Sequence, residues 1–126
     1  MGRDQMTRSE HGEQQALFEW AQIQVNLGTH PELVLMYAIP NWRAKESERI
    51  YLAAEGAKKG VPDICLPAAR GGFHGLYIEM KTERGRATKE QRSWLEALAG
   101  MGYYAVICRG FESARDVIVN YLTEVN

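Results

Sequence analysis

The sequence predicts an α/β fold in which a mixed central sheet is flanked by helices. Short apolar runs bounded by Pro or Gly alternate along the chain with longer stretches of helical periodicity. Two of these runs are separated only by a Gly-rich turn and another pair by a helical stretch, which favours both antiparallel and parallel pairing. Hydrophobic residues form 45% and charged residues 25% of the 126 residues, which is typical of one globular domain. We therefore expect a single domain over residues 1–126, with residues 1–8 as a flexible tail.

The first helix is predicted over residues 9–27, and Gly28 provides its stop signal. The side chains that recur on one side of it are Leu17, Trp20, Ala21 and Gln24. The next apolar run, residues 33–39, is continuous and ends at Pro40 and Asn41. A continuous apolar run of this length predicts a buried strand.

The middle of the chain predicts a short helix followed by two strands. Residues 46–55 have helical character and end at Gly56. Residues 63–66 form a short apolar run between two prolines, and residues 75–81 form a longer one. The segment 70–75 between them contains three glycines, so it is predicted to be a turn that pairs the two strands as a hairpin.

The last third of the chain predicts a helix, a strand and a closing helix. Thr88 and Gln91 have the spacing of a capping box, which begins the first of these helices. Its predicted inner face comprises Gln91, Trp94, Leu95, Leu98 and Met101. Residues 103–108 are the strand, and the closing helix has apolar side chains at Ala114, Val117, Ile118, Tyr121 and Leu122. The predicted order is helix, strand, helix, strand, strand, helix, strand, helix, and such mixed sheets bind ligands where strand order or direction changes.

Acidic and basic residues interrupt the two hairpin strands. A Gly-Val-Pro-Asp sequence ends in Asp63, and a Glu-x-Lys sequence places Glu79 and Lys81 inside the strand over residues 75–81. Because strand side chains alternate, Glu79 and Lys81 point to one face, while Ile78 and Met80 point to the other. A carboxylate and an ammonium group in an apolar strand are costly unless they are paired or bind a ligand. This cost indicates a functional site.

These residue types suit phosphodiester hydrolysis with a divalent metal ion. Mg²⁺ or Mn²⁺ provides Lewis acidity and a bound water of lowered pKa. Such ions prefer one or two carboxylates, together with waters and phosphate oxygens. Asp63, Glu79 and the backbone carbonyl of Met80 are the expected ligands. Lys81 could orient or deprotonate the water, or bind the scissile phosphate.

Three further residues have two interpretations each. Glu10 and Glu13 precede the apolar side of the first helix, and either could be a further metal ligand, with Glu13 closer to that side. Either could instead be a favourable charge in the first turn of the helix. Gln91 serves the capping box alone or also reaches toward the site.

The same residues allow a less specific interpretation. Asp63 could start a strand or form an Asx-turn, and Glu79 with Lys81 could be a solvent-facing pair of little energetic weight. The chain would then be a metal-independent α/β protein. The combination of Pro-Asp at a strand start with Glu-x-Lys in the next strand favours the metal site.

The distribution of charge favours nucleic acid as the partner. The net charge of −1 alone argues mildly against a nucleic-acid-binding protein. However, basic residues cluster around the predicted site, and a solvated surface is their alternative explanation. The residues expected to contact DNA phosphates are Lys58, Lys59, Arg84, Arg86, Lys89 and Arg92.

The remaining sequence features predict an intracellular protein without a membrane partner. Cys65 and Cys108 lie in apolar stretches and are expected to be reduced core residues. No apolar segment approaches the ~20 residues of a membrane span, and the polar N-terminus does not resemble a secretory signal. The expected location is the cytoplasm of a bacterial or phage host.

Six segments together resemble a known nuclease family. They are residues 10–14 (EHGEQ), 16–20 (ALFEW), 38–41 (AIPN), 56–63 (GAKKGVPD), 79–81 (EMK) and 91–95 (QRSWL). In this order they are similar to the VRR-NUC (virus-type replication-repair nuclease) branch of the PD-(D/E)xK superfamily. The resemblance extends from about residue 10 to residue 122. Its most specific part is Gly-Val-Pro-Asp with Glu-x-Lys and the downstream Gln.

The resemblance implies a restriction-endonuclease-like fold and cleavage of DNA with Mg²⁺ or Mn²⁺. Small members of the family, encoded by phages or prophages, are similar to Holliday-junction resolvases that act as homodimers. We therefore expect branched DNA as the substrate and a homodimer whose two-fold axis supplies two symmetric cuts. Glu10 and Glu13 compete for the family's N-terminal acidic position. The alternatives are a flap or restriction-type nuclease and a DNA-binding module with weak catalysis.

Overall fold

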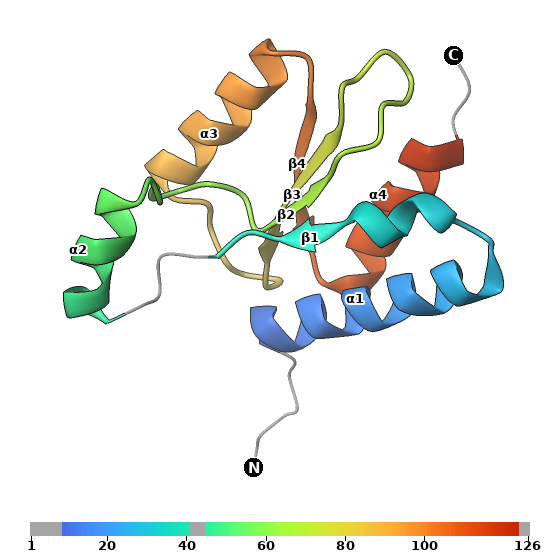
Figure 1. The fold of residues 1–126 in the computed structure, drawn as a ribbon, viewed down its shortest axis with the longest axis horizontal. Helices are drawn as coiled ribbons and strands as arrows, with labels where there is room; N and C mark the ends of the chain where they lie inside the picture. Colours follow the sequence, from blue (N-terminus) through green and yellow to red (C-terminus); the bar gives the residue numbers. More distant parts are fainter. Residues whose placement is uncertain (1–8, 41–44, 124–126) are drawn as a thin grey trace.

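The computed structural model of the chain describes residues 9–40 and 45–123 (Figure 1). Its elements are α1 (Glu10–Leu27), the 3-10 helix η1 (Pro31–Leu35), β1 (Tyr37–Ala38), α2 (Glu46–Ala54), β2 (Ile64–Leu66), β3 (Leu76–Lys81), α3 (Lys89–Gly100), β4 (Tyr104–Arg109) and α4 (Phe111–Thr123). The predicted order of helices and strands is confirmed, with η1 as an addition. The tail expected over residues 1–8 lies outside the described residues, as does Asn41, the second residue of the stop signal expected after the strand over residues 33–39.

The four strands form one mixed sheet in the order β1-β2-β3-β4. β1 pairs with β2 and β2 with β3 in antiparallel fashion, whereas β3 and β4 are parallel and connected through α3. Antiparallel neighbours need only a turn between them, while parallel neighbours need a crossover. The predicted hairpin and the predicted mixed sheet are therefore both confirmed.

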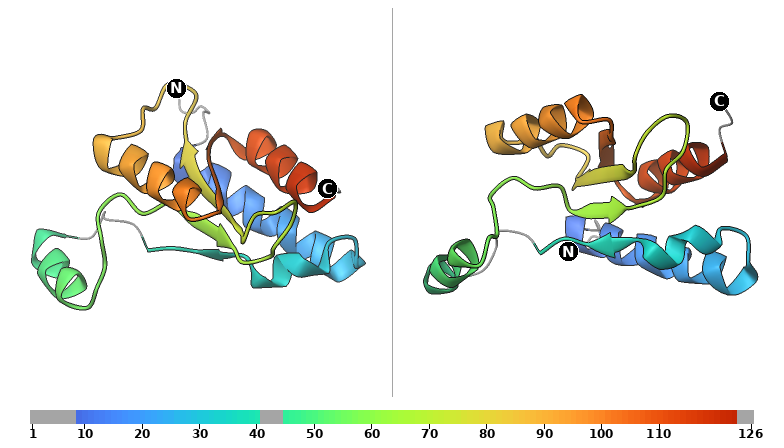
Figure 2. Two further views of the ribbon diagram at one scale, coloured as in Figure 1. Left: turned by 90° about the horizontal axis from the view of Figure 1, so that it is seen from above. Right: turned by 45° about the horizontal axis from the view of Figure 1, so that its top comes forward.

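The two faces of the sheet have different surroundings. Ile64, Ile78 and Met80 are each no more than 1% exposed, and they belong to the main hydrophobic core with side chains of α1 and α4. α1 and α4 pack against each other and against β3, as the views in Figure 2 show. Because side chains alternate along a strand, Glu79 and Lys81 lie on the face opposite this core. The helical core thus supports the strand that carries the charged residues.

The strand predicted over residues 33–39 is largely wrong. Residues Pro31–Leu35 form η1, and only Tyr37–Ala38 are extended as β1. Leu33 and Met36 are buried, whereas Val34 is 69% exposed. Burial at a spacing of three residues suits a 3-10 turn and not the alternation of a strand. The apolar run therefore reflects packing of η1 on α1 and is not evidence of a long buried strand.

The predicted helix ends agree with the structure in most cases. The Ser9 side chain accepts a hydrogen bond of 3.1 Å from the Gly12 N–H at the start of α1, and Gly28 ends that helix at a φ of 77°. In α4, the pattern of apolar positions is confirmed, since Ala114, Ile118, Tyr121 and Leu122 are all buried and Val117 packs against them. The predicted inner position of Met101 is wrong, because Met101 follows the last residue of α3 and is 71% exposed.

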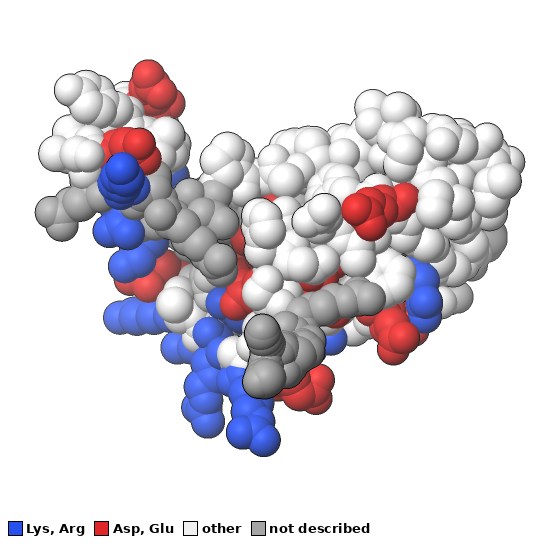
Figure 3. Space-filling model, turned by 90° about the horizontal axis from the view of Figure 1, so that it is seen from below, with Lys and Arg blue, Asp and Glu red and all other residues white. Residues whose placement is uncertain are grey.

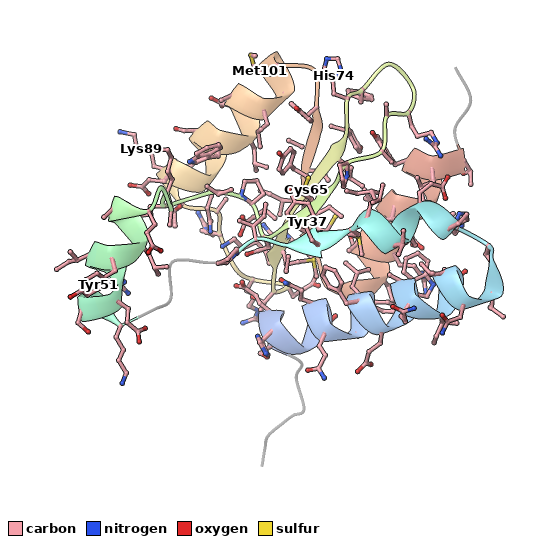
Figure 4. The ribbon with its side chains drawn as sticks, viewed as in Figure 1. Tyr37, Tyr51, Cys65, His74, Lys89 and Met101 are labelled. Atoms are coloured by element: carbon pink, nitrogen blue, oxygen red, sulfur yellow. The ribbon has the colours of Figure 1, made fainter. Side chains whose placement is uncertain are left out.

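α2 stands apart from the rest of the described chain. It lies on the connection between β1 and β2, at one side of the molecule, and packs only lightly against the other elements (Figure 1). Tyr51 is on its outer side and is 74% exposed (Figure 4).

No helix among the described residues is long and apolar enough to cross a bilayer. Cys65 and Cys108 are free thiols and both are buried, as expected.

Candidate active site

The antiparallel pairing of β2 and β3 brings Asp63 and Glu79 together. Ile64 is paired with Ile78, so Asp63, one residue before β2, lies opposite Glu79. Directly opposed residues project to the same face of a sheet with their Cβ atoms about 5 Å apart. The Asp63 Oδ2 atom also accepts a hydrogen bond of 2.7 Å from the Met80 N–H. This bond fixes the orientation of the Asp63 carboxyl beside β3.

The environment of the two carboxyl groups favours their neutral forms in the absence of a bound cation. Glu79 is only 2% exposed. Burial, followed by the nearby charge of Asp63, raises the pKa of Glu79 to about 8, although Lys81 acts in the opposite direction. Burial also raises the pKa of Asp63, against the lowering effect of the Met80 N–H. Two acidic groups held in this way are suited to a cation, whose charge offsets their mutual repulsion.

Lys81 and Gln91 both contact one oxygen of Glu79. The Lys81 Nζ lies 3.6 Å from Glu79 Oε2, and the Gln91 Nε2 donates a hydrogen bond of 3.1 Å to the same oxygen. The other oxygen, Oε1, is buried and has no hydrogen-bond partner among the described residues. A hydrogen bond with the Asp63 side chain also contributes to the raised pKa of Glu79, so the cost of an unpartnered buried oxygen arises when both carboxyls are ionised. Its position beside Asp63 therefore fits a metal ligand.

The acidic pair opens into a cavity of about 290 Å³. Acids, bases and amides from several elements line it, including Glu10, Arg49, Lys58, Lys59, Asp63, Glu79 and Gln91. In Figure 3, Lys and Arg side chains form a band beside α2, and Asp and Glu atoms lie in the hollow at its inner margin. Much of the remaining surface in that view is uncharged. The cavity that contains the acidic pair is also lined by Arg49, Lys58 and Lys59.

The donor set fits Mg²⁺ or Mn²⁺ better than zinc. Among residues 9–40 and 45–123, no group of three or more His, Cys, Asp and Glu side chains is close enough to hold a metal ion alone. A structural zinc site needs four such ligands. Mg²⁺ instead retains several waters and uses one or two carboxylates together with substrate phosphates. The pair of Asp63 and Glu79 meets that smaller requirement.

The sequence profile of the VRR-NUC domain matches residues 4–112. The chain belongs to the VRR-NUC domain family. A solved structure described as a VRR_NUC domain protein is similar to it, with a TM-score of 0.77 and 27% sequence identity over 92% of this chain and 89% of the other. No curated protein matches the chain. The VRR-NUC domain is a nuclease domain, so the chain has a nuclease fold, and divalent metal ions are general in its superfamily.

In this VRR-NUC domain, Glu10 and Glu13 have different surroundings. Glu10 lines the cavity, and its charge contributes to the raised pKa values of both Asp63 and Glu79. The Glu13 Oε1 atom accepts a hydrogen bond of 2.7 Å from the Phe111 N–H at the start of α4. A carboxylate at a helix N-terminus satisfies an otherwise unpaired donor and the helix dipole. The position of Glu13 therefore suits a cap for α4, and that of Glu10 suits the site.

The segment that carries Lys58 and Lys59 is held tightly against α3. The Trp94 Nε1 donates a hydrogen bond of 3.1 Å to the Lys59 carbonyl. Gly60 has a φ of 94°, and a Cβ atom there would lie 2.8 Å from the backbone of Glu90. Only glycine fits this approach. The two lysines at the cavity are thus positioned by a rigid backbone.

Two arginines hold the loop that follows β3. The Arg109 Nη1 donates hydrogen bonds to the carbonyls of Thr82, at 2.9 Å, and of Gly85. The Arg92 Nη1 donates one of 2.6 Å to the Ala87 carbonyl. Arg84 and Arg86, both exposed, lie within this loop. Of the residues predicted to contact phosphate, Arg92 therefore has a clear contact within the protein.

One residue predicted to contact phosphate, Lys89, lies away from the acidic pair. Two arginines at or near the site were not identified from the sequence. Lys89 is exposed at the start of α3, on the outer side of the molecule (Figure 4). Arg109 and Arg49 were not predicted. An arginine at the end of a strand or within a short helix has no sequence signal that separates it from a surface charge. Only the tertiary structure shows their contacts.

Proposed function

We propose that this protein is a metal-dependent endonuclease that hydrolyses phosphodiester bonds of branched DNA, acting as a homodimeric four-way-junction resolvase. The observation that carries the proposal is the buried pair of Asp63 and Glu79, with Glu79 Oε1 unpartnered and Lys81 beside it. The family supports a nuclease. The metal dependence, the branched substrate and the dimer are the proposed parts.

The proposed metal ligands are the carboxyls of Asp63 and Glu79 and the Met80 carbonyl, and Glu10, which lines the same cavity, is proposed to add negative charge that favours the ion. A bound Mg²⁺ or Mn²⁺ would supply Lewis acidity and a water of lowered pKa. Binding requires both carboxyls to be ionised, so the cation offsets the cost of burying Glu79 as an anion.

The other side chains position the reacting groups around these ligands. Lys81 lies on the same strand face as Glu79, at a distance where its ammonium can orient the attacking water or hold the scissile phosphate. Gln91 restricts the rotation of the Glu79 carboxyl through its hydrogen bond to Oε2. Gln91 is therefore a positioning residue in this proposal.

The proposed DNA contacts are electrostatic. Lys58 and Lys59 line the cavity, and Arg84 and Arg86 extend from the loop after β3. Lys89, on the outer side of the molecule, and Arg92, which also donates to the Ala87 carbonyl, are proposed to extend these phosphate contacts along the DNA. Binding should therefore weaken steeply with salt. Recognition is proposed to depend on the shape of the DNA, because contacts to phosphates carry no base sequence.

The proposed dimer follows from the symmetry of a four-way junction, which requires two equivalent cuts. Large exposed apolar side chains support an interface. Tyr51 and Ile50 on α2 are 74% and 71% exposed. Trp42, the other side chain considered for dimer contacts, lies outside the described residues.

The test is cleavage of a labelled synthetic four-way junction beside linear duplex of the same sequence, with Mg²⁺, Mn²⁺ or EDTA. Paired symmetric nicks confined to the junction and lost in EDTA are the expected result. Asp63→Asn should remove both cleavage and Mn²⁺ binding in calorimetry. Indiscriminate cutting would contradict junction selectivity alone, whereas tight junction binding without cutting would contradict the nuclease and favour a binding module.

A further inference from the structure

Among the described side chains of α2, two face the rest of the molecule and have different neighbours. Arg49 and Leu52 are half-buried, whereas the other described side chains of α2 are exposed. Residues three apart lie on one face of a helix. Leu52 borders an apolar hollow of about 490 Å³ beside Val61 and Trp94. Arg49 borders the cavity that contains the acidic pair. The few described side chains through which α2 approaches the rest of the molecule therefore lie at or beside the candidate site.

The charge around Arg49 suits an anion held between it and the acidic pair. Glu10, Asp63 and Glu79 line the same cavity, and Lys58 and Lys59 follow α2 along its rim. A phosphodiester approaching two carboxylates meets repulsion unless a cation lies on its other side. A metal ion on the carboxylates would supply one positive charge centre, and the Arg49 guanidinium, which lines the same cavity, would supply another.

We propose that Arg49 binds the phosphodiester at the acidic pair, so that α2 acts as an arm that holds the DNA backbone over the site. A guanidinium matches the geometry of two phosphate oxygens, which an ammonium does not. The inference rests on the proposed nuclease function. It adds a substrate contact from an element that no sequence motif of the site includes.

Binding of chemically modified DNA tests the contact directly. The position of the cut is first mapped with the wild-type protein on the four-way junction. Affinity is then measured in Ca²⁺, which replaces Mg²⁺ without supporting turnover, on junctions with one neutral methylphosphonate at the cut linkage. The wild-type protein should lose affinity on this substitution. Arg49→Ala should lose less affinity than the wild-type protein does, because only the contacts of the phosphate with the metal ion and Lys81 are then lost. Comparing both proteins on both junctions is a double-mutant cycle, which isolates the contact between Arg49 and this phosphate.

The matched control is Arg115→Ala on α4. It removes the same side chain and the same charge from a position that stacks on Phe111 and does not line the cavity. Arg49→Ala should lower kcat/KM by about tenfold to a hundredfold and reduce the salt slope of binding by about one phosphate contact. Arg115→Ala should change neither. Arg49→Lys should restore the salt slope but only part of the cleavage rate.

Several outcomes would overturn the inference. Equal kcat/KM for Arg49→Ala and Arg115→Ala, with an unchanged methylphosphonate effect, would show that Arg49 does not contact this phosphate. If Arg49→Ala loses its thermal transition, Arg49→Gln, which keeps a long polar side chain, takes its place in the same cycle. If the wild-type protein binds the junction without cutting it, the methylphosphonate is placed at each linkage near the branch point in turn. The linkage at which the loss of affinity depends on Arg49 then identifies the contacted phosphate. Failure of the wild-type protein both to bind and to cut would reject the proposed function itself.

Discussion

Gln91 connects the start of α3 to the buried carboxyl of Glu79. Its Nε2 donates to Glu79 Oε2 at 3.1 Å, while its Oε1 accepts from the Thr88 N–H at 2.9 Å. A single amide thus completes the capping box and restricts the proposed metal ligand. Gln91 therefore both completes the capping box and reaches the candidate site, because the oxygen and the nitrogen of its amide form different hydrogen bonds.

Gln91→Ala should therefore affect both stability and cleavage. Loss of the capping contact should cost about 1 kcal/mol of unfolding free energy, and loss of the bond to Glu79 should lower kcat. Thr88→Ala removes only the cap, so it should cost similar stability and less activity. Thermal denaturation and single-turnover cleavage distinguish the two effects. Equal activity losses in both variants would show that Gln91 acts only through the helix.

Lys81→Ala should abolish cleavage while junction binding in Ca²⁺ stays close to that of the wild-type protein. The ammonium is 3.6 Å from Glu79 Oε2, and it lies too deep to be a general contact for DNA, with only 7% of the residue exposed. Cleavage and gel-shift assays on the same junction provide the comparison. Unimpaired cutting by this variant would reject the proposed role of Lys81 in positioning the water or phosphate.

The metal-free protein should become less stable as the pH rises from about 5 to about 8. The pKa of Glu79 is raised to about 8 in the folded state from an ordinary value of 4.5. The folded state therefore retains a proton that the unfolded state releases, and unfolding becomes more favourable by up to about 1.4 kcal/mol per pH unit. Thermal denaturation of the wild-type protein and Glu79→Gln in EDTA tests this dependence.

In Glu79→Gln, the decrease in stability with rising pH should be smaller, because this variant has no proton to lose at position 79. Saturating Mn²⁺ should also reverse the trend in the wild-type protein, because the ion binds the ionised carboxyl and stabilises the folded state. An equal slope for both proteins in EDTA would show that Glu79 does not titrate in this range.

Substitutions at Glu10 and Glu13 should have different effects, one on metal binding and the other on the capping of α4. Glu13→Gln weakens the acceptor for the Phe111 N–H at the start of α4, so it should lower the unfolding free energy by about 1 kcal/mol. Glu10→Gln should weaken Mn²⁺ binding with little change in melting temperature. Calorimetric titration and thermal denaturation measure the two quantities. The opposite pattern would assign the metal to Glu13.

Arg109→Ala should loosen the loop that carries Arg84 and Arg86. The guanidinium donates to the carbonyls of Thr82, Glu83 and Gly85, so its loss should expose the backbone of the loop to trypsin at Arg84 and Arg86. DNA binding should weaken, while Mn²⁺ affinity at Asp63 and Glu79 should be retained. Limited proteolysis followed by mass spectrometry locates the cut. Unchanged protection of the loop would show that its position does not depend on Arg109.

The sequence by itself determined the local features of this protein. The shared face of Glu79 and Lys81 follows from the two-residue period of a strand, and the start of α3 follows from the capping box at Thr88. These features depend on neighbours within a few residues, so the pattern of residue types is sufficient. One exception is the apolar run before β1, where the packing of η1 on α1 overrides the preference of the run for a strand.

Only the tertiary structure decided which distant side chains meet. Asp63 lies opposite Glu79 because of the register of β2 on β3, and Glu13 reaches Phe111 because α1 packs against α4. Arg49 lines the cavity because the side of α2 that carries Arg49 and Leu52 is turned toward the rest of the molecule. These contacts join residues that are far apart in the chain, and their geometry is set by the packing of whole elements. That packing is why a motif can predict the chemistry of the site without identifying every residue that surrounds it.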